Sequence, residues 1–414
     1  MHTDRANQSH NKGAWGGVLA LSLAAFALVA SEFMPVSLLT PIAASLHISE
    51  GQAGQAISVS GAFALLTSLF ITAIAGRLDR KVLLLGLTLL MMASGSVVAF
   101  APNYLIFILG RALIGIAIGG FWSMSAATAM RLVPENQVSR ALAVVNGGNA
   151  LATVIAAPLG SFLGSVIGWR GAFFCVVPIA AVAFAWKLLS LPSMKTGEAS
   201  SSSSVFRLMR RPPVAWGMVA VSAFFMGQFT LFTYLRPFLE SVTRVSISML
   251  SLILFVVGAA GFLGTVLIGK LLDRGLYRTL IGIPVLMSVI ALALIKVGSS
   301  LPLTTALLGL WGLVATAAPV GWWTWLAKTL PRDAEAGGGL MVAIIQLAIS
   351  LGATLGGFAF DARGYRLTFG ISSAILLIAA GLATLAARAR SRSAPNELAT
   401  MEQHGDYPLI GCGT

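Results

Sequence analysis

The feature that most constrains this chain is a series of long apolar runs that recurs from one end to the other. A helix that spans a bilayer needs about 20 mostly apolar residues. Twelve stretches meet this requirement, at residues 15–38, 53–75, 82–100, 104–129, 141–166, 170–191, 214–238, 247–271, 279–297, 302–327, 338–360 and 366–387. Only 10% of the 414 residues are charged, against about 25% in soluble domains. The sequence therefore predicts an all-α polytopic membrane protein and excludes a soluble globular one.

The distribution of basic residues predicts how the spans are oriented. With the N-terminus inside, 20 of the 27 Lys and Arg residues, Lys187 among them, fall on the inner side, six fall outside, and Arg111 lies within a span. Cytoplasmic loops accumulate Lys and Arg, so we expect both termini in the cytoplasm. The net charge of +13 is then explained by topology, and we expect no nucleic-acid partner.

Two related halves are visible along the chain. The sequence G-R-L-D-R-K at 76–81 resembles G-K-L-L-D-R at 269–274, and G-W-R-G-A-F at 168–173 resembles G-Y-R-L-T-F at 364–369. These matches follow the same order at nearly constant offset, which indicates a duplicated six-helix unit. Such a plan places a substrate site at the interface between the repeats.

The domain boundaries follow from this plan. We expect a cytoplasmic N-terminal segment, a first six-helix bundle, a Ser-rich cytoplasmic linker, a second bundle, and a polar cytoplasmic tail without regular structure. In order, these are residues 1–14, 15–191, 192–213, 214–388 and 389–414.

Several motifs carry a family resemblance. They are E-F-M-P-V-S-L-L-T-P-I-A at 32–43, G-G-F-W-S-M-S-A at 119–126, A-P-L-G-S-F-L-G at 157–164 and F-T-Y-L-R-P at 232–237. Over about residues 15–388 the chain resembles the major facilitator superfamily, in its drug:H⁺ antiporter branch, and most of all the bacterial purine ribonucleoside efflux pumps. Two motifs depart from the family pattern: the loop after the second span is shortened, and Ala157 stands where Gly usually precedes the proline.

The resemblance implies a proton-coupled antiporter of the bacterial inner membrane, not an enzyme. It would export purine ribonucleosides such as inosine and guanosine, and purine analogues, by alternating access. Its energy source would be the proton gradient, with no cofactor, and we expect a monomer in the lipid bilayer. Two alternatives remain open. One is efflux of sugars or drugs such as chloramphenicol, and the other is a membrane sensor that binds without transporting.

Two ionisable residues lie inside apolar runs, where charge is costly and therefore often functional. Glu32 is the candidate proton carrier, and its alternative role is that of a hydrogen-bonded structural carboxyl. Arg111 lies in a stretch that resembles the family's fourth-helix motif, which implies a part in proton coupling. The alternative for Arg111 is a structural guanidinium bonded to backbone carbonyls.

Charged residues in the loops that follow the second and eighth spans are candidates for gating. The resemblance implies that these loops pair across helices in one conformation. Topology-setting charge is the alternative explanation for the cations. The candidates are Asp79, Arg80, Lys81, Asp273 and Arg274.

Aromatic and polar residues within the spans are candidates for contact with a purine ribonucleoside. Aromatic rings could stack on the base, and polar side chains could bond base edges or ribose hydroxyls. Helix packing and interhelical hydrogen bonds are the alternatives. The candidates are Phe121, Trp122, Asn149, Gln228, Thr230, Tyr234, Trp322 and Gln346.

Catalysis and metal binding have no support in the sequence. The four histidines show no metal-ligand spacing, and nothing supplies a nucleophile with its base. We therefore expect neither a catalytic residue nor a metal site.

Overall fold

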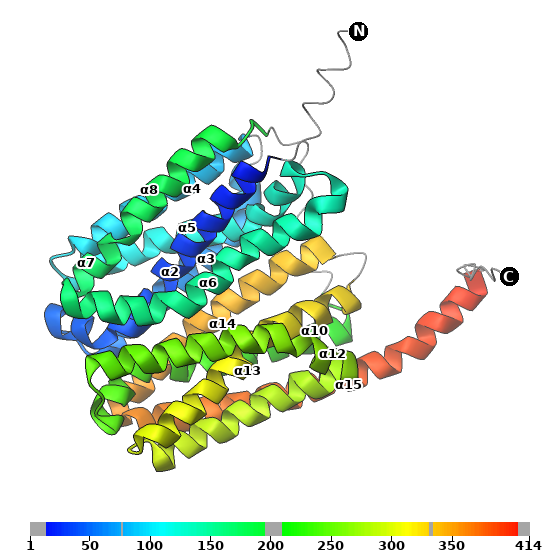
Figure 1. The fold of residues 1–414 in the computed structure, drawn as a ribbon. Helices are drawn as coiled ribbons and strands as arrows, with labels where there is room; N and C mark the ends of the chain where they lie inside the picture. Colours follow the sequence, from blue (N-terminus) through cyan, green and yellow to red (C-terminus); the bar gives the residue numbers. More distant parts are fainter. Residues whose placement is uncertain (1–13, 76–77, 195–208, 331–333, 405–414) are drawn as a thin grey trace, which may run out of the picture.

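The structure is a computed structural model that describes residues 14–75, 78–194, 209–330 and 334–404. These residues form helices and connecting turns, with no strand among them (Figure 1). The first half contains α2 (Trp15–Leu46), α3 (Glu50–Ala75), α4 (Arg80–Ala99), α5 (Tyr104–Leu132), the 3₁₀ turn η1 (Glu135–Gln137), α6 (Val138–Val166), α7 (Gly168–Phe174) and α8 (Val176–Ser190). The second contains α10 (Pro212–Phe232), α11 (Leu235–Phe238), the π-helical turn η3 (Leu239–Thr243), α12 (Ile247–Val297), α13 (Leu301–Thr329), α14 (Ala334–Arg363) and α15 (Tyr365–His404). Most of the expected N-terminal segment and linker, and the last ten residues, lie outside the described part of the chain.

Among the described residues, eleven helices are long and apolar enough to cross a membrane. One of them, α12, has 51 residues, about twice the length that one crossing needs, and its backbone leaves the helical conformation at Gly275. Because α12 is long enough for two crossings, the described residues supply twelve crossings. The prediction of an all-α polytopic fold is confirmed.

The backbone turns also show the duplication. Outside glycine, a positive φ occurs at His47 and Arg244 among the described residues, and these positions differ by 197. Positive φ also occurs at Gly168 and Gly364, which differ by 196. Left-handed backbone ends helices where the chain must reverse, so corresponding turns of the two halves have the same local geometry.

Each half has its own apolar core, and a few helices make the contact between halves. Helix α3 packs against α14, α6 packs against α12, and the short α11 packs against α2. Figure 1 shows α14 at the middle of the molecule, on the side of the second bundle that faces the first. We call the end of the bundle where α2 begins the near end, and the end with the turn after α2 the far end.

Three expectations need correction. The seventh span, expected to run to residue 238 as one helix, stops at Phe232 and continues as the separate α11 and η3. The tail is not without structure up to residue 404, because α15 continues to His404 through residues with good helix propensity such as Ala, Arg, Glu and Leu. Lys187, counted with the loop cations, lies inside α8 and is only 1% exposed. Without it, nineteen of the twenty inner-side cations remain.

Candidate functional site

The site is built around the middle of α2, where two prolines interrupt the hydrogen bonding of the helix. Pro35 and Pro41 lie inside α2, and a proline has no N–H to offer the carbonyl four residues earlier. The carbonyl groups of Ser31 and Ser37 therefore lose their partners within the helix. Both serines are buried, and a buried carbonyl inside a membrane protein must find another donor.

Arg111 of α5 supplies the donor for the first of these carbonyls. Its Nη1 donates to the Ser31 carbonyl at 2.8 Å, and its Nη2 donates to the Glu32 carbonyl at 3.1 Å. The guanidinium also donates to the Ala56 carbonyl at 3.2 Å and to Ser60 Oγ at 3.3 Å. Arg111 thus ties α2 and α3 to α5, all within the first half. These bonds are those of the structural alternative, and proton coupling by Arg111 stays a prediction.

Glu32 lies between the two halves. Its side chain is 4% exposed, and its Oε1 accepts a hydrogen bond at 3.4 Å from Nε2 of Gln346, which belongs to α14 of the second half. Gln346 Oε1 is buried and has no partner. Phe33, the next residue along α2, stacks its ring on that of Phe229 across the same boundary, 5.7 Å between centroids. One hydrogen bond and one ring pair therefore join α2 to α14 and to α10 across the boundary between halves.

Polar contacts between halves continue from Glu32 toward the far end. Ser350 Oγ donates to the Ser58 carbonyl at 2.6 Å, and Thr354 Oγ1 lies 2.9 Å from Ser58 Oγ. Beyond them Asp361 accepts from Ser49 Oγ at 2.5 Å and from the Gly51 amide at 3.0 Å. Seven hydrogen bonds between halves join described residues at or beyond Glu32 in this direction. The structure is therefore closed at its far end.

Tyr234 is part of this closure. Its hydroxyl donates to the Ala353 carbonyl at 2.8 Å, and its ring stacks on Phe360 at 5.4 Å. The same hydroxyl faces Gly54 of α3, where an added Cβ would lie 2.1 Å from it. Gly54 allows this close approach because it has no side chain. In this conformation Tyr234 packs between halves and is fully buried.

The structure separates the other residues that were predicted to contact substrate. Phe121 points into the core of the first half, 6.0 Å from Lys187 Nζ, and its ring contacts Trp122 edge-on. Trp322 packs on Phe224 and Trp325 inside the second half. In this conformation the ring of Phe121 faces the core of the first half, and the ring of Trp322 faces the core of the second. Contact of these rings with substrate therefore stays a prediction.

The polar candidates also differ from one another. Thr230 Oγ1 donates to the Met226 carbonyl of its own helix. Gln228 has a buried Oε1 without a partner, and Asn149 is partly exposed. Of the predicted set, Gln346 is the residue that the structure places against Glu32.

Asp79 caps α4 and joins it to the segment that follows α8. Its Oδ1 accepts from the Lys81 amide at 2.8 Å and from the Met194 amide at 2.9 Å, and Ser193 Oγ donates to its Oδ2. Although desolvation opposes ionisation, the bonds from Ser193, Met194 and Lys81, with the charge of Lys81, hold the pKa of Asp79 below its usual range. These partners all belong to the first half, so pairing between halves at Asp79 remains a prediction for another conformation.

The remaining gating candidates lie at the start of a helix or beside an interruption of one. Arg80 and Lys81 begin α4, while Asp273 and Arg274 are exposed beside the break at Gly275. Their role in gating is untested and stays a prediction.

Sequence reasoning missed two buried cations. Lys187 Nζ donates to Thr88 Oγ1 and lies 3.5 Å from the Leu84 carbonyl, inside the first half. Arg236, to which no role was assigned from the sequence, is 6% exposed and donates to the Ser37 carbonyl. The position of Pro41, four residues after Ser37, indicates that the Ser37 carbonyl lacks a helical donor. It does not indicate which residue donates to that carbonyl instead.

The fold and site define a two-bundle membrane protein with an ionisable group buried between the bundles. Residues 21–347 match the family model of the Major Facilitator Superfamily, and the chain belongs to that superfamily of transporters. The chain is 61% identical over 393 residues to a relative from Pseudomonas aeruginosa named transcription regulatory protein OpdE, covering 94% of this chain and 98% of the relative. It is 41% identical over 366 residues to the purine ribonucleoside efflux pump NepI of Salmonella typhimurium, covering 88% and 92%.

Solved structures show the same fold at low identity. A bacterial homolog of the human lysosomal transporter Spinster, in an inward-facing and unoccupied conformation, has a TM-score of 0.75 at 17% identity, covering 91% of this chain and 97% of that one. The human organic anion transporter MFSD10 has a TM-score of 0.65, also at 17% identity, covering 89% and 98%.

Proposed function

We propose that this protein is a proton-coupled antiporter that exports purine ribonucleosides across the bacterial inner membrane by alternating access. Inosine and guanosine are the expected cargo, and purine analogues are further candidates. The similarity to NepI over 88% of the chain supports the cargo class. The excess of basic residues at the near end supports cytoplasmic termini, so that the far end faces the outside.

The observation that carries the proposal is the burial of Glu32 at the boundary between halves, bonded to Gln346 of the other half. An ionisable group at such a place senses both the proton and the relative position of the bundles. When Glu32 carries a proton, its hydroxyl donates to Gln346 Oε1, the buried oxygen that otherwise has no partner. Protonation then strengthens the bond between halves and favours closure to the outside. Release of the proton inside weakens it and accompanies loading of cargo.

A ligand drives such a cycle only through different affinities for the two states. The bond between Glu32 and Gln346 supplies this difference for the proton, because it joins residues of opposite halves. For the cargo, the stacked rings of Phe33 and Phe229 offer an aromatic surface beside the carboxyl. A purine base that inserts there gains stacking in place of the ring–ring contact.

The test is uptake into inverted membrane vesicles energised by a pH gradient, with labelled inosine, guanosine, arabinose and chloramphenicol in parallel. Glu32→Gln keeps the size and hydrogen bonding of the side chain but carries no exchangeable charge. It should abolish gradient-driven uptake of inosine while leaving exchange of inosine across the membrane. Glu50→Gln, at the start of α3, is the matched control and should behave as the wild type.

Two results would refute parts of the proposal. Absence of any inosine or guanosine signal, with uptake of arabinose or chloramphenicol instead, would replace the cargo class. Gradient-driven inosine uptake that survives Glu32→Gln would remove Glu32 from the coupling.

A second candidate function is a membrane sensor that binds its ligand without net transport. The relative named transcription regulatory protein, 61% identical over nearly its whole length, favours it. Purified protein in liposomes separates the two functions. A sensor would bind inosine yet show no counterflow, whereas a transporter would show both.

A further inference from the structure

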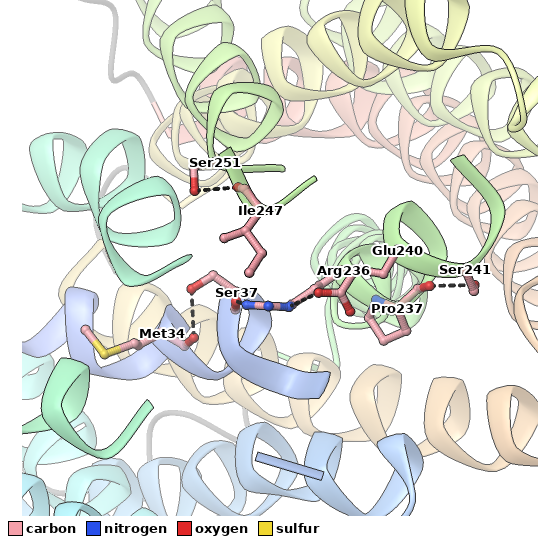
Figure 2. A network of polar contacts seen from close by, with 8 residues as sticks. All are labelled: Met34, Ser37, Arg236, Pro237, Glu240, Ser241, Ile247 and Ser251. Carbon is pink, nitrogen blue, oxygen red and sulfur yellow. Dashed lines mark hydrogen bonds and ion pairs between the residues drawn. The ribbon is translucent and has the colours of Figure 1, made fainter. Parts of the chain in front are cut away.

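The second proline of α2 leaves a carbonyl whose donor comes from the opposite half of the molecule. Pro41 removes the N–H that would otherwise pair with the Ser37 carbonyl, and Ser37 is completely buried. Arg236 of α11 donates to this carbonyl through Nη1, as Figure 2 shows. Ser37 Oγ is occupied elsewhere, since it donates to the Met34 carbonyl at 3.0 Å.

The broken seventh span directs Arg236 toward α2. Helix α10 ends at Phe232, and the chain turns before the four residues of α11 and the π-helical η3. Arg236 Nε lies 2.8 Å from Glu240 Oε1, one turn later. In Figure 2 the guanidinium lies between Ser37 on one side and Glu240 on the other. Glu240 therefore orients the arginine, and the Ser37 carbonyl receives it.

Arg111 provides an internal comparison. It satisfies the Ser31 carbonyl, which Pro35 leaves unpaired, from within the same half. That bond does not cross the boundary between bundles and can persist whichever end is open. The bond from Arg236 to Ser37 crosses the boundary, so separation of α2 from α11 must break it.

We propose that Arg236 is an outer-gate residue of the transport cycle, which closes the far end by donating to the Ser37 carbonyl that Pro41 exposes. Glu240 is its positioning partner. Its Oε2 is buried without a partner in the closed state, so a released Arg236 can take a second bond there and form a two-pronged ion pair. This second bond compensates only part of the bond lost to the Ser37 carbonyl, so Arg236 still favours the closed state. The inference rests on the proposed alternating access but not on the cargo or the proton.

The test measures access to the far end directly. Cys175 and Cys412 are replaced by serine, and Thr354→Cys introduces a thiol at a position that bonds Ser58 across the boundary. The rate of labelling by a membrane-impermeant maleimide is measured from outside intact cells, without cargo. Arg236→Gln replaces the guanidinium by a shorter amide that ends well before the position of Nη1. It should raise the labelling rate by about threefold to tenfold, the effect of losing one interhelical hydrogen bond of average or greater strength.

Pro41→Ala tests the same bond from the other partner. The alanine returns an N–H to the Ser37 carbonyl, so this carbonyl no longer needs the hydrogen bond from Arg236. The charge of Arg236 is kept, and the labelling rate should rise as it does in Arg236→Gln. Pro35→Ala is the matched control, because it is the same change in the same helix. The carbonyl that Pro35 leaves unpaired is that of Ser31, which accepts from Arg111 of the same half. The labelling rate of Pro35→Ala should therefore equal that of the parent. Since Pro41→Ala adds a helical hydrogen bond, it keeps the test open even where Arg236→Gln fails to fold.

Unchanged labelling in both Arg236→Gln and Pro41→Ala would overturn the gate, and so would an equal rise in Pro35→Ala. Failure of the cargo assignment has a different signature, since it would leave the labelling pattern intact while inosine transport is absent. A protein that never opens its far end would show no labelling in any variant, and this result would refute the gate together with alternating access.

Discussion

Replacing Arg111 by methionine should leave the Ser31 carbonyl without a partner in the interior of the first half. Methionine is unbranched, two atoms shorter than arginine and has no donor, so the change removes the guanidinium and fills part of its space. Four hydrogen bonds to α2 and α3 disappear. Three of their acceptors are backbone carbonyls, but that of Ser31 is the one that Pro35 deprives of a helical donor. The penalty attached to this carbonyl can therefore be isolated by restoring the N–H at position 35.

The magnitude follows from two measured ranges. A buried polar group left unpaired costs about 1–3 kcal/mol, and interhelical hydrogen bonds in membrane proteins contribute about 0.6 kcal/mol on average and about 1.7 at most. Their overlap is about 1–2 kcal/mol, or a factor of roughly 5–30 in the unfolding equilibrium. Arg111→Met should cost this much less in a Pro35→Ala background than in the wild type.

The assay is a double-mutant cycle on the free energy of unfolding, measured by titration with a denaturing detergent in mixed micelles. The wild type, Pro35→Ala, Arg111→Met and the double variant form the four corners. A coupling energy near zero would refute the reasoning, because the cost of Arg111→Met would then not depend on the carbonyl that Pro35 exposes.

Three further predictions concern positions away from this pair. Because the folded-state pKa of Asp79 is lowered, its contribution to stability is complete above the unfolded pKa of about 3.9 and is lost as the pH falls through the lower folded value. Below pH 4 the melting temperature of Asp79→Asn should therefore fall less steeply with pH than that of the wild type. Identical profiles for the two proteins would contradict this. Lys187→Met should be neutral or stabilising in thermal melting, whereas Thr88→Val should destabilise by about 1–3 kcal/mol because it removes the hydroxyl partner of a buried ammonium; the reverse order would show that the lysine stabilises the fold. Gly54→Ala should lower the melting temperature, since its Cβ would lie 2.1 Å from the Tyr234 hydroxyl, and Tyr234→Phe should recover part of that loss; no loss on the first change would show that α3 moves aside freely.

The spans were predictable because hydropathy is a local property that each stretch of about 20 residues carries by itself. The duplication was visible for a similar reason, and the paired turns at Gly168 and Gly364 confirm it. Glu32 stood out because a carboxyl within an apolar run is rare. Its partner Gln346 appeared among eight substrate candidates, but nothing in the sequence linked it to Glu32.

Other parts of the site could not be derived in this way. The sequence placed Lys187 with the loop cations because it is only three residues from the end of α8, close enough to reach the membrane surface. The fold instead turns its amine inward to Thr88. Phe121 and Trp322 lie on helices of the expected kind, but the rotation of each helix about its axis decides whether a ring faces its own core or the other half. Packing sets that rotation, and residue spacing alone does not.

The sequence by itself determined that this chain crosses a membrane twelve times as two related bundles, and that α2 carries two prolines and a carboxyl in its apolar run. It also determined that the Ser31 and Ser37 carbonyls lose their helical donors, since the missing N–H of a proline acts only four residues away. Only the tertiary structure decided which groups replace those donors. The two arginines lie 80 and 199 residues from the carbonyls that they serve, one in the same half and one in the other. Helix packing brings these arginines to the two carbonyls. The sequence near each carbonyl shows that a donor is needed but does not show which distant residue provides it.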